Sequence, residues 1–475
     1  MRSSPATVHR LLNRGNKPVC TRLCHFALFY SERKHIPGRR EAAAMRTSSS
    51  RRQLLQTLAT GGTLALAGCT STRTEQPPAD DSSSDTPTAS ATDSPDTPGE
   101  LTSGPDERET RTPPGSPELS PSGQWPTYRF DAANTGYNPS GAGLRNADHY
   151  WRLQPVGPAS VADGTLFTLS GESEYTSLTR RDPATIEIET QTRLVQYGTN
   201  SPPTVVGDRV YVTSFIEVFC LAADRDELLW RGPEMDGIQG NPTVSDGTVY
   251  VNSGGFRSVS PHLRAFDAET GEEQWRYDIE SESKSTPAVA DGRVFVNSRD
   301  GLHAVDATDG SAQFTVEEAA DEWGTPAVDD DTVYAVAYRD GPDELLAIDV
   351  TDGSVRWRMS AGAMRSDPPV VTPDAVYVGT EESIVAVDPT NGRKALTLGG
   401  SGEPVARVGD VLYTVRRGTV SALDTAGEGE LWSYETEEVQ VQDTIGQTIY
   451  GVTPVDDAVY VSARDGFHGI GLSNS

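Results

Sequence analysis

Residues 287–316, PAVADGRVFVNSRDGLHAVDATDGSAQFTV, contain four short apolar runs separated by three turn signals. The runs span residues 288–290, 293–297, 302–306 and 312–316. The turns lie at Asp291-Gly292, at Asp300-Gly301 and at Ala307–Gly310, and each contains Asp-Gly, a pair that tolerates the positive φ of tight hairpins. Pro287 stands at the start of the first run, where its missing N–H does least harm. Three hairpins in so short a stretch predict one four-stranded antiparallel blade.

The same pattern recurs from residue 125 onward. An apolar–aromatic–small triplet appears eight times, with its aromatic residues spaced by 44, 39, 45, 39, 43, 36 and 47 positions. These aromatics are Phe167, Tyr211, Tyr250, Phe295, Tyr334, Tyr377, Tyr413 and Tyr460. A proline precedes each at a nearly fixed distance: Pro158, Pro203, Pro242, Pro287, Pro326, Pro369, Pro404 and Pro454. Self-similarity at this period predicts an all-β, eight-bladed propeller, with seven blades as the alternative if the irregular first repeat is not a full blade.

The two ends of the repeat region complement each other. After Pro454 the last repeat supplies three strands, and a fourth strand is available upstream at residues 149–153. Pairing these segments covers two sheet edges that would otherwise promote aggregation. We therefore expect the ring to close through the strand that contains Trp151.

Each repeat ends in a motif of alanine, aspartate, glycine and tryptophan at fixed spacing. Its fullest copies contain Ala265, Asp267, Gly271 and Trp275, then Ala347, Asp349, Gly353 and Trp357, and Trp432 follows Asp424 by the same gap. The pattern resembles the tryptophan-docking motif A-x-D-x-x-T-G-x-x-x-W of the pyrroloquinoline-quinone-type propeller repeats, in the quinoprotein alcohol dehydrogenase-like superfamily. The resemblance implies that the indole packs between the alanine and the glycine and joins neighbouring blades. The chain departs from the motif at Phe314, at Leu396, at Arg225-Asp226, which shorten the loop before Trp230, and in the irregular first repeat, and these departures predict looser seams.

The N-terminal quarter differs in composition from the repeats. Residues 1–44 are basic and are interpreted as an extension ahead of a start at Met45, with a genuine basic tail as the alternative. Residues 45–69 resemble a twin-arginine lipoprotein signal peptide, with Arg51, Arg52, a short apolar stretch and Leu-Ala-Gly before Cys69. The resemblance implies acylation of the Cys69 thiol and a lipid-anchored protein on the extracellular face of the cell membrane.

Two further segments complete the domain organisation. Residues 70–124 consist mainly of Ser, Thr, Pro and acidic side chains, so they bury too little apolar surface to fold and are predicted to form a disordered tether. Residues 125–475 are predicted to form the propeller.

The charge of the chain limits its partners. The formal net charge is −29, and only four lysines occur in 475 residues. Such a surface disfavours nucleic acid and anionic membrane surfaces, which need Lys and Arg. The composition favours a protein adapted to strong salt, of the kind found in halophilic archaea. We expect a monomer that touches the membrane only through its lipid anchor.

No catalytic constellation stands out in the repeats. The dehydrogenases of the superfamily carry calcium ligands, a catalytic aspartate and a disulfide between adjacent cysteines, but this chain has no Cys-Cys pair and its repeats are compact. The histidines of the repeats, His149, His262, His303 and His468, are interpreted as unpaired, with His262 as the best remaining site candidate. Cys220 lies in an apolar strand and is interpreted as core. The sequence therefore predicts no catalytic residue, no cofactor and no metal.

Two functions remain open from the sequence. The first is a binding scaffold whose partner is a protein or an envelope polymer, since the chain resembles the BamB lipoproteins of outer-membrane assembly in length, anchoring and blade count. An archaeal envelope lacks that assembly machinery, so the partner does not carry over. The second is an extracytoplasmic enzyme, such as a quinone-dependent dehydrogenase. Convergence of carboxylates and amides at the mouth of the channel would favour the enzyme.

Overall fold

The computed structural model describes residue 119 and residues 121–172, 175–194, 201–254, 260–281, 283–318, 320–360, 362–364, 368–400, 402–441 and 444–473. The regular elements of this part are β-strands. Among the described residues, no helix is long and apolar enough to cross a membrane. The predicted extension 1–44, the signal 45–69 and the tether as far as residue 118 lie outside them.

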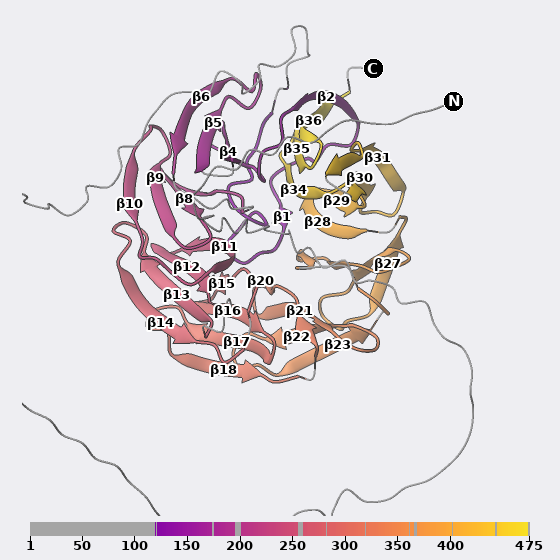
Figure 1. The fold of residues 1–475 in the computed structure, drawn as a ribbon. Helices are drawn as coiled ribbons and strands as arrows, with labels where there is room; N and C mark the ends of the chain where they lie inside the picture. The colour runs from indigo at the N-terminus through magenta and orange to yellow at the C-terminus, as the bar shows by residue number, and fades with distance from the viewer. Residues whose placement is uncertain are drawn as a thin grey trace, which may run out of the picture. The chain divides into compact units, whose positions relative to one another are not determined.

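Eight antiparallel sheets form a ring (Figure 1), so the eight-bladed prediction is confirmed. Blade 1 contains β3 (Ser160–Ala162), β4 (Thr165–Glu172), β5 (Tyr175–Arg181) and β6 (Ile188–Arg193), and blade 2 contains β7 (Thr204–Val206), β8 (Arg209–Thr213), β9 (Val218–Ala222) and β10 (Leu228–Arg231). Blade 3 contains β11 (Ile238–Ser245), β12 (Thr248–Ser253), β13 (His262–Asp267) and β14 (Glu273–Asp278), and blade 4 contains β15 (Ala288–Ala290), β16 (Arg293–Ser298), β17 (Gly301–Asp306) and β18 (Ala312–Val316).

The second half of the ring repeats this arrangement. Blade 5 contains β20 (Ala327–Asp329), β21 (Thr332–Tyr338), β22 (Glu344–Asp349) and β23 (Val355–Ser360), with β19 (Glu322–Trp323) also on β21. Blade 6 contains β24 (Val370–Val371), β25 (Val376–Gly379), β26 (Ile384–Val387) and β27 (Lys394–Leu398), and blade 7 contains β28 (Glu403–Val408), β29 (Val411–Arg416), β30 (Thr419–Asp424) and β31 (Gly429–Glu435). A separate hairpin, β32 (Val439–Val441) and β33 (Thr444–Gly446), follows blade 7.

Local sequence explains the blades. In blade 4 the first hairpin turns at Asp291 and Gly292, whose φ angles are 49° and 68°, as the Asp-Gly pair predicts. The predicted strands of this blade match β15 to β18 to within one or two residues. The repeated aromatics lie in the second strand of each blade and are buried, which places the core between adjacent sheets.

Blade 8 closes the ring. It contains β34 (Ile449–Pro454), β35 (Ala458–Ala463), β36 (Gly466–Leu472) and β2 (Ala147–Leu153). β2 pairs antiparallel with β36, so Leu153 lies opposite Phe467 and Trp151 opposite Gly469. The Trp151 side chain is 2% exposed, and a Cβ on Gly469 would come within 2.2 Å of its indole ring. The expected pairing of the two ends is therefore present.

The described residues before β2 form no blade of their own. β1 (Tyr137–Asn138) adds to blade 7 as a parallel partner of β28. Ahead of Trp125, Leu119 is buried and the Ser122 carbonyl accepts a hydrogen bond from the Asp456 N–H.

Candidate functional site

Residues 121–138, which we call the plug, lie inside the ring (Figure 1). Plug carbonyl oxygens accept hydrogen bonds from backbone N–H groups of seven blades, at 2.7–3.0 Å. The donors are Val161, Val205, Val289, Val328, Val371, Arg407 and Asp456, in blades 1, 2, 4, 5, 6, 7 and 8. Most of these donors follow the leading proline of a repeat, on the innermost strand of its blade. An innermost strand has an unpaired edge, and the plug supplies the partners that such a buried edge requires.

Asn134 anchors one side of the plug. Its side chain is 1% exposed, and its Nδ2 donates to the carbonyl oxygens of Thr286, Pro287 and Pro326 at 3.2–3.3 Å. These carbonyls belong to the entries of blades 4 and 5. One buried amide therefore joins two blades to the plug, and its φ of 59° is one that asparagine tolerates better than most residues.

Arg129 anchors the other side. Its guanidinium donates to the carbonyl oxygens of Pro368 and Val405, and to that of Pro404 at 3.3 Å, at the entries of blades 6 and 7. The Arg129 carbonyl accepts from the Gly136 N–H at 2.8 Å, which closes a loop inside the ring. Since Arg129 is 7% exposed, its charged group is buried among carbonyl dipoles.

The carboxylate of Asp131 lies in this loop and accepts its hydrogen bonds from other plug residues. It accepts hydrogen bonds from the Ala133 and Thr135 N–H groups at 3.1 and 3.0 Å. Burial raises the pKa of Asp131, and the hydrogen bonds from Thr135 and Ala133 and the charge of Arg129 act against that rise. The carboxylate thus shapes the turn rather than facing an open channel.

The residues on the ring axis do not fit a quinone or a calcium ion. The amide of Asn134 and the guanidinium of Arg129 already bind main-chain carbonyls, and the plug backbone hydrogen-bonds to the innermost strands. Within the described part of the chain, no three His, Cys, Asp or Glu side chains come together as metal ligands.

A pocket of about 370 Å³ lies beside the plug. It is lined by plug residues, by the first turn of blade 1 with Asp163 and Gly164, and by Asp456 of blade 8. Burial, followed by the charge of Asp457, raises the pKa of Asp456. This pocket lies between loops and offers a small molecule two carboxylates.

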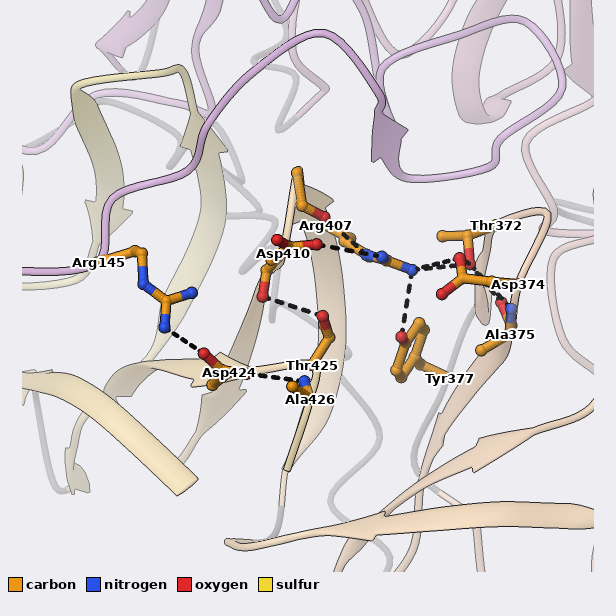
Figure 2. Close-up of polar contacts among 11 residues, drawn as sticks. Arg145, Thr372, Asp374, Ala375, Tyr377, Arg407, Asp410, Asp424, Thr425 and Ala426 are labelled. Atoms are coloured by element: carbon orange, nitrogen blue, oxygen red, sulfur yellow. Dashed lines mark hydrogen bonds and ion pairs between the residues drawn. The ribbon is translucent and has the colours of Figure 1, made fainter. Parts of the chain in front are cut away.

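Arg407 lies on β28, the strand of blade 7 that pairs with β1, and bonds to residues of blade 6 (Figure 2). Its Nη1 donates to Asp374 Oδ1 at 2.7 Å, to Thr372 Oγ1 at 3.1 Å and to the Tyr377 hydroxyl at 3.2 Å. Its guanidinium also lies 5.3 Å from the ring centroid of Tyr137 in β1. Burial alone would raise the pKa of Asp374, but hydrogen bonds from Arg407 and Thr372 lower it on balance. The cluster joins blade 6, blade 7 and β1.

Arg145 adds a second ion pair on the same side of blade 7. Figure 2 shows its guanidinium pointing toward Asp424, whose carboxylate also accepts from the Ala426 N–H at 2.7 Å. The Asp424 side chain is buried and that of Arg145 is half-exposed. Both arginines therefore bind the N-terminal segment to the ring, and their partners are internal to the fold.

The seams between blades carry the motif residues of the sequence. Trp275 lies opposite Ala265 in its own blade and against Gly310 of blade 4, where a Cβ would be 2.6 Å from the indole. Its Nε1 donates to the Ala307 carbonyl of that blade at 3.1 Å. Trp230 of the preceding blade packs against Gly271 in the same way, since a Cβ there would lie 2.6 Å from its indole.

The later seams follow this geometry. Trp357 lies opposite Ala347 and against Gly392 of blade 6, and Gly353 receives Phe314 of blade 4. Trp432 donates its Nε1 to the Leu144 carbonyl at 2.6 Å, so the last seam uses the segment between plug and β2. Leu396 lies farther from its glycine, because a Cβ on Gly427 would be 3.3 Å from it, against 2.5 Å for Trp357 and Gly392.

The structure corrects the prediction that the histidines are unpaired. His149 Nε2 lies 3.3 Å from His468 Nδ1, and the Tyr434 hydroxyl lies 3.0 Å from the same Nδ1. His468 Nε2 lies 3.0 Å from Asp465 Oδ1. Burial lowers the pKa of both histidines. The pair forms because β2 returns beside β36, a contact between residues 319 positions apart.

The other predicted candidates lie apart from this cluster. His303 bonds the Tyr277 hydroxyl at 3.2 Å and the Ser298 hydroxyl at 2.8 Å, and burial lowers its pKa. His262 lies beside Asp278 at the edge of blade 3. Cys220 is fully buried on β9, and burial raises the pKa of its thiol, so it is a poor nucleophile. Arg51, Arg52 and Cys69 fall outside the described residues.

Comparisons with known proteins agree with this geometry. A family model described as outer membrane protein assembly factor BamB matches residues 149–278 and 259–466. Among curated proteins, the lupanine 17-hydroxylase (cytochrome c) of a Pseudomonas species is 34% identical over 77 residues, which are 15% of this chain and 11% of that protein. The chain thus matches only a small fraction of that relative's length.

Solved structures share the fold at low identity. BamB from Moraxella catarrhalis is 17% identical, with a TM-score of 0.51 over 69% of this chain and all of that chain. A europium-containing methanol dehydrogenase is 12% identical, with a TM-score of 0.56 over 71% of this chain and 89% of that chain. A quinohemoprotein alcohol dehydrogenase from Comamonas testosteroni is 13% identical, with a TM-score of 0.56 over 74% of this chain and 81% of that chain. At these identities the likeness concerns the fold alone.

Proposed function

The chain belongs to the family described as outer membrane protein assembly factor BamB, and from this we propose that it is an extracytoplasmic binding scaffold rather than an enzyme. The fold is compatible with a scaffold and with a quinone-dependent dehydrogenase. The proposed partner is a protein or a polymer of the cell envelope. The plug is the observation that separates these two functions.

The plug supports a scaffold because its backbone and two of its side chains occupy positions inside the ring and bond to the blades there. Enzymes act in concave sites that bury most of the substrate. Here the axis holds the side chains of Arg129 and Asn134, and seven blades bond to plug carbonyls. The surfaces left for recognition are the loops on the two rims and the outer strands, which suit a large partner better than a small substrate.

The second candidate is a dehydrogenase-like enzyme that uses the pocket beside the plug. Its support is the fold shared with two alcohol-oxidising enzymes and the pocket carboxylates of Asp163 and Asp456. Oxygen ligands of this kind are those that calcium prefers. This candidate requires a cofactor beside the plug instead of on the axis.

Quinone binding distinguishes the two candidates. The full chain is purified in molar salt, because an acidic surface repels itself at low ionic strength, and is incubated with pyrroloquinoline quinone and calcium. We expect no retained quinone absorbance after gel filtration and no dye reduction with alcohols or aldoses. Asp456→Asn serves as the matched control, since it changes only the pocket. Stoichiometric quinone retention that Asp456→Asn abolishes would establish the enzyme instead.

Co-purification tests the scaffold directly. The full chain is isolated from native membranes in molar salt after mild cross-linking, and the bound material is identified by mass spectrometry. We expect one envelope protein or polymer in stoichiometric amount. Recovery of the chain alone, together with quinone retention in the previous experiment, contradicts the scaffold.

We also propose that the protein is anchored through a lipid on Cys69, on the extracellular face of the membrane. The support is the ordered series of Arg51, Arg52, a short apolar stretch and Leu-Ala-Gly before Cys69. Cys69→Ser is expected to release the protein into the medium or to leave an uncleaved precursor. Membrane fractionation and the mass of the mature chain measure the outcome, and normal processing of Cys69→Ser contradicts the proposal.

A further inference from the structure

We propose that His149 and His468 bind a divalent transition-metal ion of the Zn²⁺ class where blade 8 meets blade 7, with the Tyr434 hydroxyl beside the ion. This site is separate from the plug and goes beyond the proposed scaffold function. It joins the first strand after the plug, β2, to the last strand of the chain, β36, and to the outer strand of blade 7, β31.

The distance between the two imidazoles fits such an ion. His149 Nε2 and His468 Nδ1 are 3.3 Å apart. Zinc binds histidine nitrogen at about 2.0–2.1 Å with tetrahedral angles, which places two such nitrogens roughly 3.3–3.4 Å apart. An ion can therefore sit between the rings with little movement of either ring.

Asp465 orients His468 toward the ion. Its Oδ1 accepts from His468 Nε2 at 3.0 Å, and its Oδ2 accepts from the Glu437 N–H at 2.9 Å. With the proton on Nε2, the lone pair of His468 Nδ1 faces His149 and Tyr434. A carboxylate behind a histidine in this way is the usual support of a metal-binding imidazole, since it fixes the tautomer and raises the basicity of the ligand.

Three polar atoms meet at this point. His468 Nδ1 has one lone pair, and both the Tyr434 hydroxyl and His149 Nε2 lie within 3.3 Å of it. In the tautomer of His149 that carries its proton on Nδ1, Nε2 also presents a lone pair to this space. A cation accepts a lone pair from each imidazole and leaves the phenol to bond a metal-bound water.

Packing holds the rings in position while leaving a path to solvent. His468 is fully buried, and His149 stacks parallel on Tyr434 with ring centroids 4.8 Å apart. His149 itself is exposed, so an ion can enter from outside. Ligands that are fixed before binding lose little conformational entropy when the ion arrives.

The nearby charges permit a cation. Arg152 is the closest basic side chain, and its Nη1 lies 2.6 Å from Glu437 and 3.6 Å from Asp465. These two carboxylates balance the guanidinium and leave the local charge negative. Since the protein offers two imidazoles and one phenol, water must complete the coordination, and the ion should be removable by chelators.

Blade 4 supplies an internal control. His303 occupies the same repeat position as His468, after Asp-Gly, and bonds Tyr277 of the preceding blade at 3.2 Å. Its Nε2 faces the Ser298 hydroxyl instead of a carboxylate, and its Nδ1 neighbours are the Tyr277 and Thr315 hydroxyls. The second imidazole and the carboxylate are specific to blade 8, so the proposed site is too.

The test measures metal binding to the full chain after treatment with a chelator. Co²⁺ is added first, because tetrahedral nitrogen ligation gives a visible absorption band, and Zn²⁺ is then used to displace it. We expect a saturable band and a thermal midpoint several degrees higher with Zn²⁺. His149→Gln, at an exposed position that should not disturb folding, is expected to remove both effects.

Two further variants make the result specific. Asp465→Asn should weaken binding by about 10–100-fold, as expected for the carboxylate behind a ligand. His303→Gln should leave the absorption band and the affinity unchanged. The proposal is overturned if His149→Gln binds Co²⁺ as tightly as the unaltered chain, or if His303→Gln removes the band while His149→Gln keeps it.

Discussion

A chain that begins at Gly157 is expected to aggregate or to melt far below one that begins at Trp125. The shorter chain lacks β2, so the outer edge of β36 has no partner, and it also lacks the plug that covers the innermost strands. Open edges of this kind pair with other chains. Thermal melting and light scattering in molar salt measure the difference. Equal melting temperatures would contradict closure through β2.

A single substitution isolates the closing strand from the plug. Trp151→Ala removes a side chain that is 2% exposed and that packs on Gly469 and near Tyr460. Truncation of a buried aromatic to alanine costs about 3–5 kcal/mol. Tyr150→Phe is the matched control, since the Tyr150 ring is partly exposed on the same strand. Chemical unfolding should show a large fall in midpoint for Trp151→Ala and a small change for the control.

The second large effect is expected at the plug. Arg129→Met and Asn134→Leu should each lower the free energy of unfolding by about 2–4 kcal/mol, because each leaves buried carbonyl oxygens without a donor. The double variant should also admit protease cleavage within residues 121–138. Arg225→Met is the control, since Arg225 makes only exposed ion pairs with Asp224 and Glu227.

The outcome distinguishes a structural plug from a passive one. If Arg129→Met and Asn134→Leu unfold at the same denaturant concentration as the unaltered protein, the plug adds no stability, and its place on the axis needs another explanation. If only the double variant is cut by protease, the two anchors support each other, as neighbouring contacts often do.

The sequence predicted the blades because their determinants are local. The turn at Asp291 and Gly292 and the buried Phe295 two positions into the next strand are set by residues a few positions apart. Eight copies of that pattern specify the architecture without long-range information. The closing strand was also predictable, since an incomplete last blade requires a partner.

The plug could not be predicted in the same way. It has no repeat and no period, and its course depends on positive φ angles at Asn134 and at Arg129 and Phe130, of which arginine and phenylalanine seldom adopt them. Its partners are backbone groups on seven blades, and a backbone partner leaves no sequence signal. Burial of Leu119 was hidden for a similar reason, because one apolar residue in a polar segment carries little weight.

The histidine cluster was missed because it depends on register. Whether His149 reaches His468 is decided by the pairing of β2 with β36, which brings together residues 319 positions apart. The repeated Asp-Gly-x-His pattern of His303 and His468 was visible, but its second imidazole was not.

The plug has a consequence for the order in which the protein folds. It leaves the ribosome before any blade exists, yet its partners extend from Val161 to Asp456, and β2 must wait for β36. Contacts between such distant residues fold slowly, because a long loop must close before they form. During synthesis the innermost edges therefore remain open, and the nascent chain depends on being kept apart from its copies. The ring can close only when β36 has been synthesised and becomes available to β2.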